Sequence, residues 1–158
     1  MQKKASRSEG EQVPDLEGDY FVTEFIPYML NHITNTMNQR FKKSLKKYKL
    51  NVSQWRVLVA LGARSGASFI DLGEFTAIDQ PSLSRIVEQL VERDLVTRAP
   101  RPGDARYSEI ALTPAGRELR DTAWPLALEH GGKTVEALSA AEQDVLRGLL
   151  KRIMVSLG

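Results

Sequence analysis

The chain has 158 residues with 22 Lys and Arg, 20 Asp and Glu, two His and no Cys, which gives a formal net charge of +2. This length fits one domain with one core, and the lack of thiols excludes disulfides, thiolate metal sites and cysteine oxidation. His32 and His130 have no neighbouring cluster of ligand residues, which argues against a structural zinc site. The net charge is too small to indicate a nucleic-acid ligand, so that indication must come from where the charges lie.

The sequence also argues against membrane, secreted and enzymatic classes. No apolar run approaches the roughly 20 residues needed to span a bilayer, and the polar start MQKKASRSEGEQ lacks the apolar core of a signal peptide. The chain contains no glycine loop that cradles phosphate, no cluster of metal ligands and no nucleophile with a histidine signature nearby. We therefore expect a cytoplasmic protein that is not an enzyme and carries no metal and no cofactor.

The N-terminal part is predicted to hold a polar arm and one long helix. Residues 1–18 are polar and lack periodicity, so we expect a flexible arm ahead of a single domain over 19–158. Residues 19–48 follow a helical pattern that is apolar around much of its first half, which predicts two packing partners. The last part of this helix carries a basic run without an acid, and both a solvated helix face and a phosphate-facing patch remain open for it. The run consists of Arg40, Lys42, Lys43, Lys46, Lys47 and Lys49.

Three helix starts follow in close succession. Asn51 can cap a helix, and the glutamine three residues later can complete a capping box. Ser68 can cap a short helix over 69–75, and Asp79 can cap the next one, whose start is set near residue 80 by Pro81. Two short helices joined by a tight turn form a helix-turn-helix.

The helix that begins near residue 80 and the segment after it predict a DNA-reading helix with a wing. The helix has one apolar face at the spacing that meets a core, opposite Ser82, Arg85 and Gln89. The pattern then changes to a strand over 95–99, a turn over 100–105, and a returning strand. Such a unit suits a helix in the major groove with a β-wing beside it. The predicted core-facing residues of the helix and returning strand are Leu83, Ile86, Val87, Leu90, Val91, Ile110 and Leu112.

Both ends of the chain predict a helical dimerisation layer. Thr113 followed by a proline indicates a helix start, and Pro125 is expected to kink the helix that begins there. Ser139 opens a last helix through a capping box, and the broad apolar face of that helix needs a cover. The chain is thus divided into dimerisation helices at 19–48 and 114–158 and a winged helix-turn-helix lobe at 51–113.

These elements, in this order, resemble the MarR family of winged-helix transcription regulators over roughly residues 20–157. The resemblance rests on LNVSQWRVLVAL from Leu50, SLSRIVEQLVERDLVTR from Ser82, the wing motif Asp104-Ala105-Arg106, and LTPAG from Leu112. It implies a mainly α fold with a small β-hairpin wing. One departure is Asp94, where the family usually has a glycine, but aspartate can also adopt the left-handed conformation.

Four polar residues of the predicted recognition helix are candidate DNA contacts. Gln80 and Arg85 can form bidentate contacts with base edges, which discriminate between bases by about 1–3 kcal/mol. Ser82 and Ser84 can accept either base or bind phosphate, which would position the helix. The alternative is a surface helix with ordinary polar residues.

Four residues of the predicted wing complete the candidate interface. The resemblance implies that Arg106 enters or approaches the minor groove and that the carboxylate of Asp104 orients its guanidinium. Arg98 and Arg101 are expected to bind phosphates. The alternative is an exposed ion pair in a turn, worth no more than about 1 kcal/mol to stability.

The resemblance further implies a homodimer on a pseudo-palindromic DNA site, with the two recognition helices about 34–36 Å apart. It also implies a small aromatic or phenolic acid in the crevice between the dimerisation helices and the DNA-reading lobe, for which the candidate residues are Tyr28, His32, Trp55 and Arg56. Tyr28 and His32 share a helix face, although such a histidine is more often an interface residue and Trp55 more often belongs to a core. The expected function is a repressor that its ligand releases from DNA. A regulator without an effector and a winged helix used only for protein contacts remain the alternatives.

Overall fold

The computed structural model describes residues 23–64, 66–101 and 104–157, and the side chains of residues 101–107 are outside the described part. The predicted arm over 1–18 and the predicted first residues of the long helix, 19–22, lie outside the described residues. The chain forms two compact units, residues 1–37 and 38–158. The described residues are mainly helical with one antiparallel hairpin, which confirms the predicted fold class.

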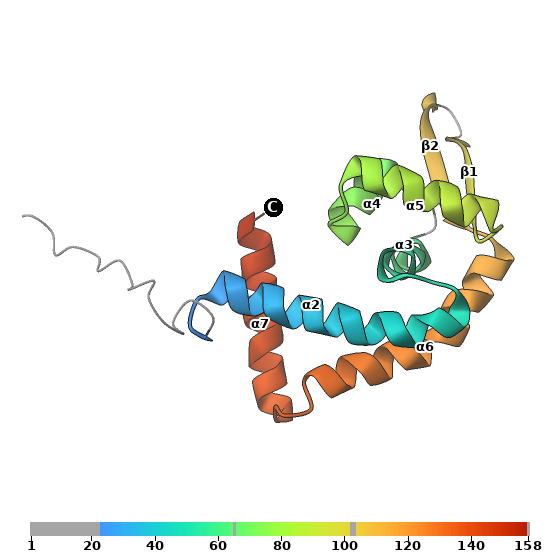
Figure 1. Ribbon diagram of the computed structural model, residues 1–158. Coiled ribbons are helices and arrows are strands. Elements are labelled where there is room, and N and C mark those ends of the chain that lie inside the picture. Colours follow the sequence, from blue (N-terminus) through green and yellow to red (C-terminus); the bar gives the residue numbers. More distant parts are fainter. Residues whose placement is uncertain (1–22, 65, 102–103, 158) are drawn as a thin grey trace, which may run out of the picture. The chain divides into compact units, whose positions relative to one another are not determined.

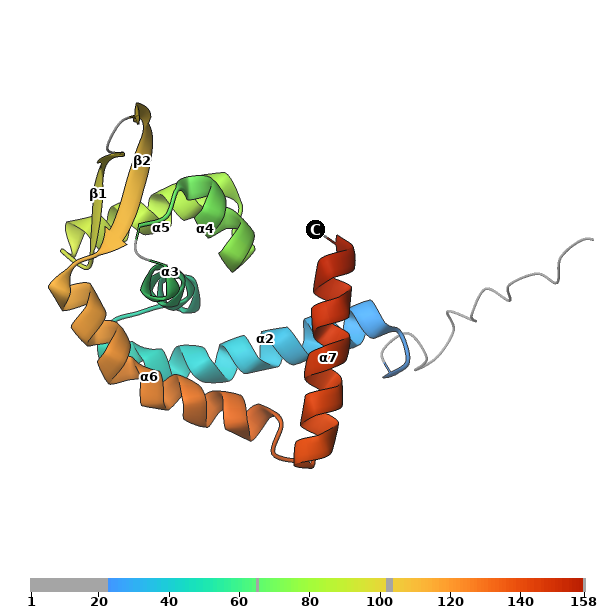
Figure 2. The ribbon, with the colours of Figure 1, turned by 180° about the vertical axis from the view of Figure 1, so that it is seen from behind.

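The order of the elements follows the prediction, with α3, α4, α5 and the hairpin grouped together in both ribbon views (Figures 1 and 2). None of the helices in the described ranges is long and apolar enough to cross a membrane. In chain order the elements are α2 (Ile26–Leu45), η1 (Lys46–Tyr48), α3 (Val52–Ala63), α4 (Phe69–Thr76), α5 (Gln80–Glu92), β1 (Val96–Arg101), β2 (Asp104–Leu112), α6 (Pro114–Thr134) and α7 (Ala140–Leu157).

The predicted helix caps are present. The Asn51 side chain accepts a hydrogen bond from the Gln54 backbone N–H at 2.8 Å, and the Gln54 side chain accepts from the Asn51 N–H at 3.1 Å, which completes a capping box. Ser68 caps α4 through a second capping box, formed with Asp71, whereas Asp79 caps α5 through its side chain alone, which accepts from the Ser82 backbone N–H. These bonds satisfy backbone donors that have no partner within the helix, so each helix start follows from residues close in sequence.

The core of the winged lobe forms between α3, α4, α5 and the hairpin, with Leu45 added from the end of α2. Leu83, Val87 and Leu90 of α5 are fully buried, as predicted. Ile86 is half-buried and packs against this core, as predicted, but Val91 is 40 % exposed, so the predicted apolar face was too broad at Val91. Each residue turns the helix by about 100°, so Val91 points well away from the direction of Leu90. The other fully buried large side chains of the core are Leu45, Val57, Leu58, Leu72, Val96 and Ile110.

The hairpin is longer than predicted. β1 continues through Pro100 to Arg101 and β2 resumes at Asp104, so the predicted turn over 100–105 is wrong. A proline fits in an edge strand because it need not donate to a neighbour, and the pairing register shifts just after it, between Pro100 and Arg101. Ala67 exchanges two backbone hydrogen bonds with Ile110, at 3.0 and 2.9 Å, and this bridge attaches the hairpin to the segment between α3 and α4.

The junction between the hairpin and α6 is closely packed. The Thr113 hydroxyl accepts from the Gly116 N–H at 2.9 Å and donates to the Asp94 carbonyl at 2.7 Å. Asp94 has φ of 55°, the left-handed conformation expected for it. A Cβ on Gly116 would overlap the Leu95 carbonyl oxygen, so this position requires glycine. α6 then runs without a break through Pro125 to Thr134.

The apolar faces predicted for dimerisation are uncovered in the single chain. Among the described residues of α7 none is buried. The described start of unit 1 likewise exposes large apolar side chains, which is what a surface for another subunit requires. The exposed residues are Phe25, Ile26, Met29, Leu30 and Ile33 in the first unit, and Val145, Leu146, Leu149, Leu150, Ile153, Met154, Val155 and Leu157 in α7. The assignment of these two segments to a dimerisation layer stays a prediction.

Candidate nucleic-acid interface

The start of α5 is held by its own cap. The Asp79 carboxylate accepts from the Ser82 backbone N–H at 3.0 Å, and the hydrogen bonds from the Ser82 backbone and hydroxyl lower the pKa of Asp79 below its usual value. The carboxylate therefore stays ionised at neutral pH and occupies one of the N–H groups at this helix end. The remaining donors at the end of a helix favour an anion such as a phosphate.

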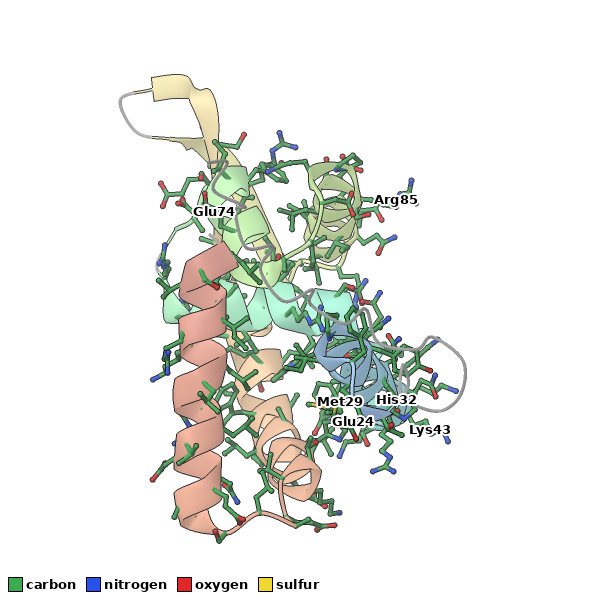
Figure 3. All side chains as sticks on the ribbon, turned by 90° about the vertical axis from the view of Figure 1, so that its left-hand side faces the viewer. Glu24, Met29, His32, Lys43, Glu74 and Arg85 are labelled. Carbon is green, nitrogen blue, oxygen red and sulfur yellow. The ribbon has the colours of Figure 1, made fainter. Side chains whose placement is uncertain are left out.

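Arg85 is the most clearly presented of the predicted DNA contacts. It lies one turn into α5, on the face opposite Leu83 and Val87, and it is exposed. Figure 3 shows its side chain pointing away from α5 into solvent. Among the described residues, no carboxylate lies within salt-bridge distance of it, so its guanidinium fork is available for a base edge or a phosphate.

The other three predicted contacts of α5, Gln80, Ser82 and Ser84, form hydrogen bonds within the chain. The Gln80 amide donates to the Phe69 carbonyl at 3.2 Å, which ties the start of α5 to the start of α4. A bidentate contact with adenine would require this bond to break, so the geometry of the free chain makes Gln80 a brace between the two helices. Ser84 donates to the Glu88 carboxylate at 3.3 Å, while Ser82 stands next to the Asp79 cap.

The wing residues are placed on the two strands of the hairpin. The Arg98 Nε donates to the Ser108 hydroxyl at 3.2 Å, and its guanidinium carbon lies 5.0 Å from the Phe69 ring centre. Arg98 is thereby held flat against the lobe at the base of the wing. Arg101 and Asp104 face each other in the strand register at the far end. Arg106 follows on β2, and the side chains of Arg101, Asp104 and Arg106 lie outside the described residues, so their roles stay predictions.

The basic run lies on the last part of α2 and on η1. Its members are exposed, and Figure 3 shows Lys43 projecting toward the same side of the view as Arg85. Arg93, just beyond α5, donates to the Lys49 carbonyl at 2.8 Å and to the Tyr48 carbonyl at 3.4 Å. These bonds fix the end of the recognition helix to the basic run. This link was not predicted, because nothing near Arg93 in the sequence indicates its partners.

A second missed contact joins α3 to α5. The buried Gln54, which completes the cap of α3, also donates from Nε2 to the Gln89 Oε1 at 3.1 Å. Gln89 is exposed, as predicted for its face of α5, and its side chain also reaches the buried Gln54. The bond connects the N-terminus of α3 directly to the recognition helix, and only the packing of the two helices reveals it.

The predicted ligand residues fall in both units. In the first unit the rings of Tyr28 and His32 are stacked, with centres 6.3 Å apart and planes 15° apart, which confirms that they share a face. In the second unit Trp55 is buried and Arg56 donates to the Asn38 side chain at 3.4 Å. A cavity of about 240 Å³ is lined by Trp55, Arg56, Val59, Phe75 and Thr76. That both pairs line one ligand crevice stays a prediction.

Trp55 also belongs to an aromatic cluster. Its ring meets Phe41 edge to face at 6.0 Å and lies 6.3 Å from the ring of Trp124. The residue is therefore a core side chain that also lines the cavity, and its role in binding a ligand stays a prediction. Within the described ranges, no three His, Asp or Glu side chains are placed to hold a metal ion.

Comparisons with known proteins agree on one family. A MarR family model matches residues 48–106. The HTH-type transcriptional repressor NicR of Pseudomonas putida is 31 % identical over 137 residues, which cover 87 % of this chain and 87 % of NicR. The HTH-type transcriptional repressor IacR of Pseudomonas putida is 26 % identical over 90 % of this chain and 86 % of IacR.

A solved structure extends the same likeness to the whole fold. Bordetella bronchiseptica BpsR, whose DNA binding is regulated by 6-hydroxynicotinic acid, superposes with a TM-score of 0.76 at 29 % identity, over 82 % of this chain and 98 % of that one. A mutant of Escherichia coli MarR complexed with operator DNA superposes with a TM-score of 0.76 at 19 % identity, over 85 % of this chain and 96 % of that one, and shows the same fold.

Proposed function

The chain belongs to the MarR family of transcription regulators, and from this premise we propose that it is a dimeric repressor that a small aromatic acid releases from its operator. The family binds DNA and is not enzymatic. The observation that carries the proposal is the exposed Arg85 on a capped α5, which is braced at Gln80, Gln89 and Arg93 beside the hairpin. A helix held at several points presents its side chains to a groove with little loss of freedom on binding.

The roles proposed for the helix residues rest on this geometry, and those proposed for Arg101, Asp104 and Arg106 rest on the family resemblance. Arg85 would contact a base edge in the major groove, with Ser82 and Ser84 positioning the helix on the backbone and Gln80 joining them if its bond to α4 opens. Arg106, oriented by Asp104, would contact the minor groove. Phosphates would be bound by Arg98, Arg101 and the basic run of α2 and η1. A transcription regulator that makes these DNA contacts would act in the cytoplasm.

Repression and ligand release are supported by relatives. NicR and IacR are repressors, and the DNA binding of BpsR is regulated by 6-hydroxynicotinic acid. The cavity beside Trp55 and Arg56 offers an aromatic ring and a guanidinium, which are the groups that a flat carboxylic acid would meet. Tyr28 and His32, whose rings stack in the first unit, remain the other two candidate ligand residues. A ligand that binds the free form more tightly than the DNA-bound form lowers the affinity for the operator.

The test is a gel-shift titration with the operator selected from a random DNA pool. Arg85→Ala and Arg106→Ala should each weaken operator binding by about tenfold or more, because each removes a charged contact with the groove. Arg147→Ala removes the same charge from α7, where Arg147 pairs with Asp144 in its own helix, and should bind as the parent does. Parental affinity in both interface variants would contradict the assignment. The absence of any duplex binding at low salt would instead favour a protein-interaction module.

A further inference from the structure

Arg98 lies on a face of the hairpin that is otherwise apolar. It is paired with Ile110, and two positions away Val96 is paired with Leu112. These three apolar side chains are buried in the core of the winged lobe. Side chains alternate between the two faces of a strand, and residues directly opposite each other share a face. Arg98 therefore extends a buried apolar row, and a charged group in this position must reach solvent or find a partner in the lobe.

Two side chains hold the guanidinium of Arg98. Its carbon lies 5.0 Å from the centre of the Phe69 ring, and its Nε donates to the Ser108 hydroxyl at 3.2 Å. Ser108 is paired with Pro100 and reaches Arg98 diagonally across the two strands. The Nε carries one of the five N–H donors of an arginine, so four donors remain on a side chain that is exposed. No carboxylate in the described part of the chain forms an ion pair with Arg98.

The Phe69 ring has a fixed place because contacts on two sides set the backbone that carries it. Ala67, two residues earlier, exchanges two backbone hydrogen bonds with Ile110 of β2. The Phe69 carbonyl accepts from the Gln80 amide, at the start of α5, at 3.2 Å. Gly73, one turn further along α4, leaves room for the same amide, since a Cβ there would lie 3.3 Å from the Gln80 Nε2. The ring that supports Arg98 is thereby positioned relative to both the hairpin and the recognition helix.

An arginine that is already held suits contact with a phosphate. A free arginine loses side-chain freedom when it binds, and this loss weakens the contact. Arg98 loses less, because Phe69 and Ser108 already restrict its guanidinium. Phosphate contacts fix the register and orientation of a protein on the duplex, so an arginine with a fixed place relative to α5 would also help to set how α5 enters the groove.

We infer that Phe69 and Ser108 are positioning residues for DNA binding, which hold Arg98 at the base of the wing for contact with a phosphate of the DNA. Phe69 acts through Arg98 and through its bond to Gln80, and it need not touch the DNA itself. The inference rests on the proposed DNA-binding function, whereas the hold on Arg98 can be measured in the free chain.

The first measurement is the NMR spectrum of the full chain without DNA. The Phe69 ring should shift the Arg98 Nε–H resonance upfield, and this resonance is assigned by its absence in Arg98→Lys. Phe69→Leu should abolish the shift, whereas Phe69→Tyr keeps an aromatic ring and should retain it. An unchanged resonance in Phe69→Leu would overturn the hold on Arg98.

The second measurement is operator affinity in the gel-shift titration. Phe69→Leu should weaken binding by about two- to fivefold, the factor expected from one exposed contact between an arginine and an aromatic ring, and Phe69→Tyr should bind as the parent does. Arg98→Gln should weaken binding to operator and random duplexes alike and reduce the slope of log affinity against log salt by about 0.9. In the Arg98→Gln background, Phe69→Leu should cost less than about 1.5-fold, because the guanidinium that it positions is gone. In the Arg85→Gln background the two losses should multiply, since Phe69 does not hold Arg85.

Ser108→Ala tests the positioning even if Phe69→Leu disturbs folding, because it removes only the hydroxyl that accepts from the Arg98 Nε. It should weaken operator binding by about twofold or more and have no effect in the Arg98→Gln background. Parental affinity in both variants, or undiminished losses in the Arg98→Gln background, would contradict the positioning role while leaving the regulator intact. Failure of the parent to bind any duplex would instead overturn the proposed function, and with it the DNA role of Phe69 and Ser108.

Discussion

Substitution of Gln89 tests whether its hydrogen bond to Gln54 stabilises the packing of α3 against α5. Gln89→Leu deletes the oxygen that accepts from the Gln54 Nε2 at 3.1 Å. Gln54 is only 8 % exposed, and its side-chain Oε1 already accepts from the Asn51 N–H. The side chain therefore cannot turn toward water without losing that capping bond. A buried donor left without a partner costs about 1–3 kcal/mol. We therefore expect Gln89→Leu to lower the free energy of unfolding by about 1–2 kcal/mol, more than an ordinary substitution on a helix surface.

The assay is a double-mutant cycle with Gln54→Met, measured by urea unfolding at one fixed protomer concentration. Gln54→Met also removes the donor, so Gln89→Leu should cost less in that background, and the coupling energy should be about 0.5–1.5 kcal/mol. Gln89→Leu should also weaken operator binding, because α5 loses one of its braces. Strict additivity, with a single-variant loss under about 0.3 kcal/mol, would refute the reasoning, because the hydrogen bond would then contribute nothing to stability.

Three further outcomes are expected. Lys46→Gln should weaken binding to all duplexes equally and reduce the slope of log affinity against log salt by about 0.9, if the side chain meets a phosphate; an unchanged slope would assign the basic run to a solvated face. Thr113→Ala should lower the free energy of unfolding by about 1–2 kcal/mol, because the buried hydroxyl bonds both Gly116 and Asp94. Thr113→Ser keeps the hydroxyl and should retain most of the parent's stability. Equal losses for the two variants in urea unfolding would contradict the role of the hydroxyl. The pKa of Asp79 is lowered in the folded chain, so its cap stabilises above the unfolded value of about 3.8 and is lost as pH falls below it. Relative to Asp79→Asn, which does not titrate, the parent should lose stability below that pH, and parallel pH profiles of the two melting temperatures would contradict the cap.

Comparison of sequence and structure shows which features are local. Helix starts at Asn51, Ser68, Asp79 and Thr113 were predicted correctly, because each cap bonds a residue three positions away. The burial of Ile110 and Leu112 and the left-handed Asp94 were predicted for the same reason, since alternation and turn chemistry depend on neighbours in sequence. The turn predicted over 100–105 was wrong for the opposite reason, because it depends on pairing between strands. Pro100 and its neighbours have the composition of a turn, but pairing with β2 extends the strand through them.

The DNA site was predicted in part. Arg85 is presented as expected, but Gln80 bonds α4, and Arg98 lies against Phe69 at the base of the wing. The side chains of a predicted interface also contact one another and the lobe, and the residue type alone does not indicate which of them do so. The candidate ligand residue Arg56 lies beside a cavity, and the contact of Arg120 with Gly62 of α3 was not predicted, because no residue near Arg120 in the sequence indicates it.

The sequence by itself determined the order of helices, their caps, the hairpin and the family, since these depend on period and on bonds within about one helical turn. Tertiary structure alone decided how α5 is held, through Gln80 to Phe69, Gln89 to Gln54 and Arg93 to Lys49, pairs that are 11, 35 and 44 positions apart. It also decided that Arg120 crosses α3 at Gly62. Such contacts depend on the rotation and separation of packed helices, and a shift of one residue in either helix would turn the partners about 100° apart.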